Sequence, residues 1–400
     1  MRVSVAFFFL SLLSTFGSLP AQKQWVVDIL NRPGTDFVDF PPALQAAADG
    51  DCIFLRSYPV TGGGRYTGAD IAKAVTLIGE GSEPIRLDKG QVGCRVSNIP
   101  LGKAFRMSHV MMEAVATFVN CAGQIHLDTI GPVPSTATAL DFAGCSAVTI
   151  VNSKISGFIN INAMTCVASN ITATSCTFTG GTVYSLASPG SPAIVSTASS
   201  LTLNQCVATG GTVLLGWPLQ PWPAILAQSS NLRISGVAGP RYESRYDAGT
   251  GSIVTIHAID TTGGSVILDP RTLVLDSNWN PESVWGTAQV ALVQQPFLTC
   301  ASALRGASFT LTLNGQAGDG FGTMVALPAP PLSTPWGDWW LDANTLAILD
   351  LGTLGVLGTR ALTIPVPATA AIAGLPLAFQ TFAGQGNTAI LTPAVVTVIQ

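Results

Sequence analysis

The feature of this sequence that most restricts its fold is a short pattern that recurs five times between Ile125 and Gly239. Each copy reads polar or small, apolar, polar, apolar, and successive copies begin 23, 23, 30 and 31 residues apart. The copies are Gln124–Leu127, Ala147–Ile150, Asn170–Ala173, Ser200–Leu203 and Asn231–Ile234. A period of two places the apolar residues on one face of a short strand. One strand cannot bury that face alone, so the repeat predicts stacked coils in which each coil contacts mainly its neighbours.

A leucine-rich repeat is the nearest competing architecture, because Leu201–Cys206 matches part of that consensus. The other copies lack the full leucine set, and the rest of each unit is rich in Gly, Ser, Thr and Pro without a helical period. The pattern therefore favours an all-β solenoid.

Segments upstream of the repeat carry a family resemblance. Phe40–Asp51 looks like a capping helix with an entry turn into the strand Cys52–Leu55, and Ala74–Gly81 looks like the next strand and turn. From about Trp25 to Leu275 the chain resembles the right-handed parallel β-helix proteins of the pectate-lyase-like superfamily, which include many exported bacterial proteins of unknown function. The resemblance implies the fold but leaves the function open, because unrelated activities can share one fold.

The N-terminal residues 1–21 predict a secretory signal peptide. They combine Arg2, an apolar core and the helix-breaking Gly17 and Pro20, with cleavage expected after Ala21. The sequence therefore predicts an exported protein, secreted or held at the cell surface.

Two further regions follow. Residues 22–285 are expected to form the right-handed parallel β-helix, with a short capping helix near 41–48. Residues 286–400 contain apolar strands between Gly/Pro turns, which is typical of a small antiparallel β-sandwich-like domain. We expect this domain to cap the open end of the solenoid, which otherwise exposes a sheet edge.

Charge and composition argue against several partners. Charged residues make up 10% of the chain, the net charge is −4 and Lys and Arg do not cluster, so we expect no nucleic-acid partner. The late uncharged stretch Ala361–Phe379 contains three prolines, so no transmembrane segment is expected after the signal peptide.

The eight cysteines are predicted to be structural. Cys176 and Cys206 each lie five residues after the first apolar residue of their copy, and so occupy equivalent places in adjacent coils. We expect buried free thiols that pack as small apolar groups. A Cys176–Cys206 disulfide is the alternative, because stacked strands lie about 4.8 Å apart. Without a CxxC motif, and with three histidines, the sequence predicts neither a metal site nor a cofactor.

Sugar-cleaving β-helix enzymes use clustered aspartates, or calcium-binding carboxylates with a basic residue. The polygalacturonase-type motifs are absent, and the outward positions of the repeat are rich in threonine. His126 and Asp128 interrupt this row and are the only weak catalytic candidates. We expect them to form a solvated, structurally neutral pair, and we assign no catalytic residue.

Two clusters are the candidate ligand-binding residues. Trp217 and Trp222 lie in a proline-rich insertion that lengthens the fourth unit, and aromatic rings on a rigid loop suit stacking on sugars. A second cluster has alternating charges, a pattern that more often forms a solvated loop. Its candidates are Arg241, Tyr242, Arg245 and Tyr246.

Three functions fit this sequence. The first is a non-catalytic exported β-helix protein that presents an extended surface for adhesion or for binding a polysaccharide or cell-surface glycan. The second is a polysaccharide lyase or glycoside hydrolase with an atypical site. The third is a structural component of a cell-surface assembly. The first fits best, because the repeat lacks a carboxylate cluster.

Overall fold

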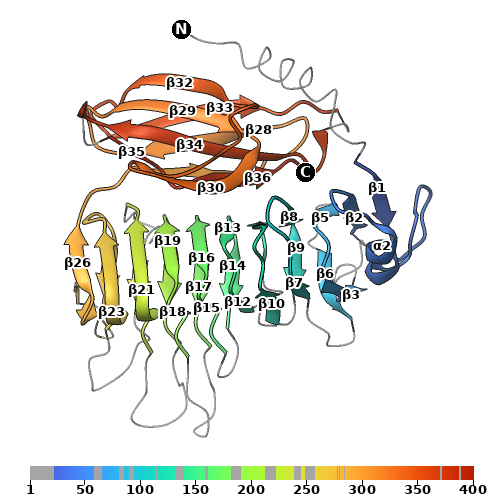
Figure 1. Cartoon of the computed structure of the whole chain (residues 1–400), viewed down its shortest axis with the longest axis horizontal. Helices are drawn as coiled ribbons and strands as arrows, with labels where there is room; N and C mark the ends of the chain where they lie inside the picture. Colours follow the sequence, from blue (N-terminus) through green and yellow to red (C-terminus); the bar gives the residue numbers. More distant parts are fainter. Residues whose placement is uncertain are drawn as a thin grey trace, which may run out of the picture.

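The computed structural model describes residues 22–57, 65–80, 85–89, 94–112, 115–131, 139–157, 161–181, 191–211, 222–237, 245–247, 257–276, 278, 280–282, 284–369, 372–386 and 389–400. These residues are mostly β-structure, with one short α-helix, α2 (Phe40–Ala46). A long stack of parallel strands is followed by antiparallel sheets (Figure 1). The predicted fold class, a parallel β-helix with a C-terminal β-domain, is confirmed. The predicted signal peptide lies outside the described residues.

Each complete coil contributes one strand to each of three parallel sheets. The first sheet contains β4 (Asp70–Ile71), β7 (Arg95–Ser97), β10 (Val115–Val119), β12 (Ala139–Ala143), β15 (Met164–Val167), β18 (Ile194–Thr197), the first halves of β21 (Ile225–Ser235) and β23 (Ile259–Leu268), and β25 (Trp285–Gly286).

The second sheet contains the repeated strands. Its members are β1 (Gln24–Val27), β2 (Cys52–Arg56), β5 (Thr76–Glu80), β8 (Ala104–Ser108), β11 (Gln124–Asp128), β13 (Ala147–Val151), β16 (Asn170–Thr174), β19 (Ser200–Asn204), the second halves of β21 and β23, and β26 (Gln289–Leu292). The third sheet is divided into two parts. One part contains β3 (Arg65–Thr67), β6 (Ile85–Lys89) and β9 (Val110–Met112), and the other contains β14 (Lys154–Ser156), β17 (Thr177–Thr179), β20 (Val207–Thr209), β22 (Arg245–Asp247) and β24 (Leu273–Leu275).

The predicted alternation buries one face of each repeated strand in the solenoid core. Ile125, Val148 and Ile171 stack in register and are fully buried. Phe118 and Phe142 stack with ring centroids 4.8 Å apart. At the N-terminal end, Phe40, Ala43 and Leu44 of α2 join this core.

The coils turn between sheets at single residues with positive φ. Between the first and second sheets these are Asn120, Gly144, Ala168, Ala198, Ser229 and Gly263. Between the second and third sheets they are His109, Thr129, Asn152, Ser175 and Gln205. Left-handed backbone is uncommon for residues other than glycine. The left-handed conformation recurs at equivalent places in successive coils, which shows that stacking of the coils imposes it.

Cysteine and serine follow these corner residues and perform the same structural role. Ser169 Oγ donates to Val167 O at 2.8 Å, and Cys176 Sγ donates to Thr174 O at 3.3 Å. Cys206 repeats the geometry of Cys176 one coil later, with Sγ donating to Asn204 O. All eight cysteines are free and buried. The structure therefore contains stacked thiols and no Cys176–Cys206 disulfide.

The C-terminal domain consists of antiparallel sheets. One contains β27 (Phe297–Cys300), β28 (Ser308–Asn314) and β33 (Thr359–Pro365), and the other contains β32 (Ala347–Thr353), β29 (Gly320–Ala326), β34 (Pro376–Gly384), β35 (Ile390–Leu391) and β36 (Val395–Val398). A ribbon of β30 (Pro328–Thr334) and β31 (Gly337–Leu341) completes it. We refer to this domain as the sandwich. Parallel pairing continues through β26 to Leu292, so the change of sheet type falls after Leu292 and not at 286.

The expectation that the sandwich caps the open end of the solenoid is wrong. The sandwich lies along the side of the solenoid, over the second sheet (Figure 1). Val290 and Leu292 continue the inward rows into the last coil, yet remain 44% and 64% exposed. The physical reason is that the early coils carry outward apolar side chains. Phe54 and Ile78 pack against Ala373 and Val398 of the sandwich.

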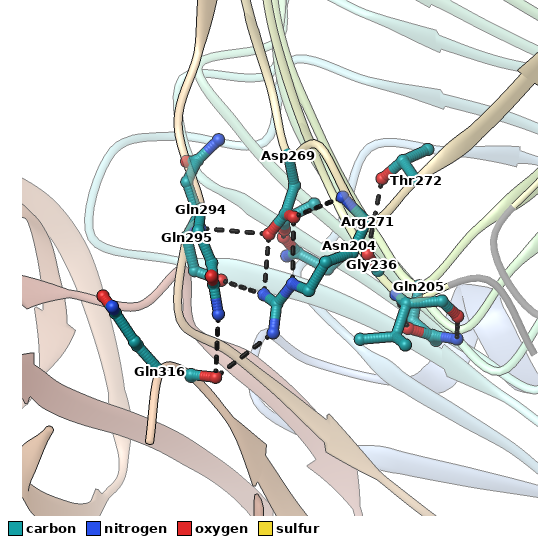
Figure 2. Close-up of polar contacts among 12 residues, drawn as sticks. Asn204, Gln205, Gly236, Asp269, Arg271, Thr272, Gln294, Gln295 and Gln316 are labelled. Carbon is teal, nitrogen blue, oxygen red and sulfur yellow. Dashed lines mark hydrogen bonds and ion pairs between the residues drawn. The ribbon is translucent and has the colours of Figure 1, made fainter. Parts of the chain in front are cut away.

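An ion pair between a buried carboxylate and a partly buried arginine fixes the segment that joins the solenoid to the sandwich (Figure 2). Asp269 is fully buried and binds Arg271 through two contacts, Nη2 to Oδ2 at 2.7 Å and Nε to Oδ1 at 3.0 Å. The backbone N–H of Gln295 donates to Asp269 Oδ2, and Gln295 O accepts from Arg271 Nη2. Arg271 Nη1 also donates to Gly315 O of the sandwich.

Among the described residues, no helix has the length and apolar character needed to cross a membrane.

The thiols should be counted by titration with a thiol reagent. Because all eight cysteines are buried and free, we expect the native chain without reductant to react slowly. The same chain unfolded in denaturant should show eight thiols. A count of six or fewer in the unfolded, unreduced chain contradicts the stacked-thiol arrangement.

Removing one member of the Asp269–Arg271 pair should destabilise the protein strongly. We expect Asp269→Ala to lower the free energy of unfolding by about 3–5 kcal/mol, because it removes a fully buried carboxylate that pairs with the partly buried Arg271 and accepts a hydrogen bond from the backbone of Gln295. Asp350→Ala is the control, because its partner Arg360 is half exposed and that pair should contribute below about 1 kcal/mol. Urea denaturation measures both, and similar losses in the two variants contradict the assignment.

Candidate functional site

The outward positions of the repeated strand form a polar row beneath the sandwich. Pairing between coils places Thr76, Arg106, His126, Thr149 and Thr172 one above another, about 4.8 Å apart. We call these five residues the covered row. Thr76, His126, Thr149 and Thr172 are buried, and Arg106 is partly buried.

The expectation that His126 and Asp128 are solvated is wrong, because the sandwich covers both. Each side chain is 1% exposed. His126 Nδ1 lies 2.6 Å from Thr149 Oγ1, and its Nε2 lies 3.4 Å from Gln124 Oε1. Burial and the nearby positive charge of Arg106 hold the pKa of His126 well below its usual range, so the ring is neutral at pH 7.

Asp128 connects the two domains. Its Oδ2 accepts from Thr397 Oγ1 at 2.9 Å, and its Oδ1 accepts from Thr129 Oγ1 at 2.9 Å. Thr129 in turn contacts Ser302 Oγ at 2.8 Å. Burial raises the pKa of Asp128 above its usual value. In this arrangement His126 and Asp128 face the sandwich, and a polymer in solution does not reach them.

The covered row also contains an arginine that the sequence reasoning missed. Arg106 occupies the second position of Ala104–Ser108, a strand with the same alternation as the five repeat copies. If the alignment of the repeat is extended by one coil toward the N-terminus, Arg106 falls at the position beside His126. Burial lowers the pKa of Arg106 to about 10.

A cleft lies beside the covered row, between the solenoid and the β30–β31 ribbon. Its volume is about 310 Å³. On the solenoid side it is lined by Gln124, Ala147 and Asn170, which stack on three successive coils, and by the turns that precede them. Its other wall is formed by Pro330, Pro331, Ser333 and Asp338 of the ribbon. No sequence pattern indicates this cleft, because the position of the sandwich creates it.

The tryptophans of the sandwich differ in exposure. Trp340 is 3% exposed and packs with Ala147 of the solenoid and Ala394, which makes it a domain contact. Trp336 is 52% exposed and contacts the ring of Phe382 edge-on.

The predicted ligand-binding clusters are only partly described. Trp217, Arg241 and Tyr242 lie outside the described residues. Trp222 is half-buried, and its indole N–H is buried without a hydrogen-bond partner. The backbone N–H of Trp222 donates to Gly211 O.

The strand β22 contains Arg245 and Tyr246, so these residues form part of the third sheet and not a loop. Asp247 of the same strand pairs with Thr209, two residues before Gly211. Trp222 and the end of β22 therefore lie at one corner, where the third sheet leads to the first. This corner lies across the coil from the sheet that the sandwich covers.

A metal site is not formed by the described part of the chain, since no three His, Cys, Asp or Glu side chains gather there in a suitable arrangement.

Comparison with known proteins assigns the chain to no family. No protein-family model matches it, and no curated protein matches it significantly. A solved structure that aligns with it is the full-length tailspike protein 2 from Escherichia coli O157:H7 bacteriophage CAB120. That alignment covers 87% of this chain at 12% identity and a TM-score of 0.23. It covers 51% of the tailspike, so the chain spans about half the length of that protein.

Asp128→Asn tests the buried carboxyl. The pKa of Asp128 is raised in the folded state above its usual value of 3.8, so the folded chain holds this proton more tightly than the unfolded chain does. Wild-type stability from this group is therefore lost as the pH rises through the raised pKa. We expect the free energy of unfolding of Asp128→Asn relative to wild type to increase as the pH rises above about 4. A stability difference between Asp128→Asn and the wild type that does not change with pH contradicts the raised pKa of Asp128.

Proposed function

We propose that the protein is an exported, non-catalytic β-helix protein that binds a polysaccharide or cell-surface glycan. The observation that supports this most is the cleft between the solenoid and the β30–β31 ribbon. Its volume of about 310 Å³ lies at the lower end of the range for small-molecule sites, which suits one or two sugar units.

The lining of the cleft has the chemistry that sugars require. Gln124 and Asn170 offer amide groups, and Ser146 and Ser333 offer hydroxyls. Asp338 is exposed at the ribbon and accepts from Ser333 Oγ at 2.7 Å. Leu101 and the two prolines add apolar surface against which the C–H face of a pyranose can pack.

The non-catalytic part of the proposal is supported by the burial of the two catalytic candidates. A general base must come within hydrogen-bond reach of the group it deprotonates. His126 and Asp128 instead bond within the protein, to Thr149 and Thr397.

Export and family membership are part of the same proposal. The signal-peptide pattern of residues 1–21 supports export. Three parallel sheets closed at the N-terminal end by α2 support membership in the pectate-lyase-like superfamily.

A steric variant tests the cleft. We expect Asn170→Trp to fill it and weaken binding on a glycan array at least tenfold, using the chain from Gln22. Asn231→Trp is the matched control, because Asn231 occupies the same strand position two coils further on and is exposed. Equal binding by the two variants contradicts the cleft as the site.

Further measurements distinguish the cleft from the other candidate surface, and glycan binding from the other candidate functions. Loss of binding in Trp217→Ala/Trp222→Ala, with binding intact in Asn170→Trp, assigns the glycan site to the corner near β22. Release of unsaturated products or reducing ends from a polysaccharide supports a lyase or hydrolase instead. A chain that binds no glycan and fractionates with the cell envelope supports a structural role.

A further inference from the structure

The two ends of the solenoid differ in how the described part of the chain covers them. At the N-terminal end, α2 packs on the core and closes it. At the other end, β26 is the last strand of the stack (Figure 1). Val290 and Leu292 of β26 occupy inward positions in register with the buried Val266 and Leu268, yet both are exposed. The apolar core therefore reaches the surface at β26.

The backbone of β26 is also open on one side. This strand pairs with β23, and no other described strand pairs with its far edge. Proteins commonly protect such an edge with charged side chains or proline. The segment Gln289–Leu292 contains no proline, and no charged residue occurs between Glu282 and Arg305. The far edge of β26 is therefore a template on which a further strand can pair.

A turn of the sandwich extends the apolar surface beside β26. Val356 and Leu357, between β32 and β33, are 94% and 84% exposed. Gln294 Nε2, two residues after β26, donates to Gly315 O at 3.1 Å, and the backbone N–H of Gly315 donates to Gly358 O at 2.8 Å. Two hydrogen bonds therefore link the end of the solenoid to this turn. We call the exposed apolar residues of the strand, its end and the turn the open-end patch: Val290, Leu292, Val293, Val356 and Leu357.

The open backbone edge decides which partner suits this patch. A lipid surface covers apolar side chains but leaves the N–H and C=O groups of the edge without partners, which is unfavourable in an apolar medium. A second copy of the chain supplies both an apolar surface and a matching edge. Head-to-tail stacking into a filament is blocked, because α2 covers the opposite end. Two copies can instead meet end to end about a two-fold axis, which closes the assembly.

The size of the patch indicates that the strand and the turn act together. The equivalent positions Val266 and Val290 are about 24 residues apart, which is the length of the last coil. At about 3.3 Å per residue, a coil of this length encloses at most roughly 500 Å². A stable interface buries about 800 Å² of each partner. The end of the coil alone is too small, so the turn at Val356 and Leu357 has to contribute.

We propose that the open-end patch is the interface of a tail-to-tail homodimer, in which β26 of one copy pairs antiparallel with β26 of the other. Directly opposite residues on antiparallel strands have their side chains on the same face. The register that buries both inward side chains places Val290 of each copy opposite Leu292 of the other. Ala291 then lies opposite its own counterpart, on a two-fold axis perpendicular to the second sheet. The two open cores meet, and both sandwiches lie on one side of the dimer.

Sedimentation velocity of the chain from Gln22 tests the dimer. Between about 1 and 100 µM we expect the mass to rise from that of a monomer to that of a dimer. Leu292→Lys should raise the dissociation constant at least tenfold, because it places a charge in the interface. Leu332→Lys is the matched control, because Leu332 is 65% exposed and Leu292 is 64% exposed, but Leu332 lies on the β30–β31 ribbon. A wild type that stays monomeric throughout, or equal dimerisation of the two variants, overturns the proposal.

A second variant keeps the test decisive if Leu292→Lys does not fold. Val356→Asp/Leu357→Asp changes an exposed turn outside the cores, so the chain should fold as the wild type does. Because two like charges then face the same turn of the other copy, we expect the dissociation constant to rise at least tenfold. An unchanged dissociation constant in this variant overturns the proposed interface.

Cross-linking tests the register. Directly opposite residues on antiparallel strands have Cα atoms about 4.5–5.5 Å apart, within the range of a disulfide. We therefore expect Ala291→Cys to give a disulfide-linked dimer under mild oxidation, since Ala291 is exposed and the native cysteines are buried. Ile348→Cys, at an exposed position of β32, is the control and should give none. A dimeric Ala291→Cys chain that does not cross-link overturns the strand pairing.

Vesicle binding separates a second copy from a lipid surface as the partner. We expect the dimeric chain not to co-sediment with phosphatidylcholine vesicles, because dimerisation buries the open-end patch. A monomeric chain that binds these vesicles, and loses binding in Val356→Asp/Leu357→Asp, assigns the patch to lipid and overturns the proposal.

Discussion

Hydrogen bonding between successive coils is the constraint on which this structure depends. Each coil is held in register with its neighbours, so a residue type chosen at one position is repeated along a whole row. The rows explain features that look unrelated in the sequence. Corner residues take positive φ in many successive coils, and the cysteines and serines behind them bond to equivalent carbonyls. Cys121, Cys145, Cys176 and Cys206 therefore act as part of the solenoid and need no disulfide.

Stacking in register also determines where the sandwich binds. The early coils carry Phe54 and Ile78 on the outward face of the second sheet, and the sandwich buries them. Further along, the same face becomes polar, and the contact changes to hydrogen bonds such as Thr397 to Asp128. A polar face under a second domain leaves some groups unmatched, because two rigid β-surfaces do not complement each other everywhere. The cleft arises in this way.

The repeated strands and the sandwich strands were predictable, because alternation and Gly/Pro turns act locally. The position of the sandwich over the second sheet was not predictable. Threonine rows such as Thr149 and Thr172 are compatible with either solvent or a polar domain contact, so His126 and Asp128 looked exposed. The outward Phe54 and Ile78 were the available signal, and they lie upstream of the five aligned copies. Arg245–Asp247 was expected in a loop because charged residues obscure the short third strand. The cleft depends on packing between residues more than a hundred positions apart, which no local pattern encodes.

The most direct test of this account is a crystal structure of the chain from Gln22 with the oligosaccharide that binds most tightly on the glycan array. The account predicts a sugar ring in the cleft, between Asn170 and the β30–β31 ribbon. An oligosaccharide bound at the corner near Trp222 and β22, with the cleft free of sugar, would contradict it.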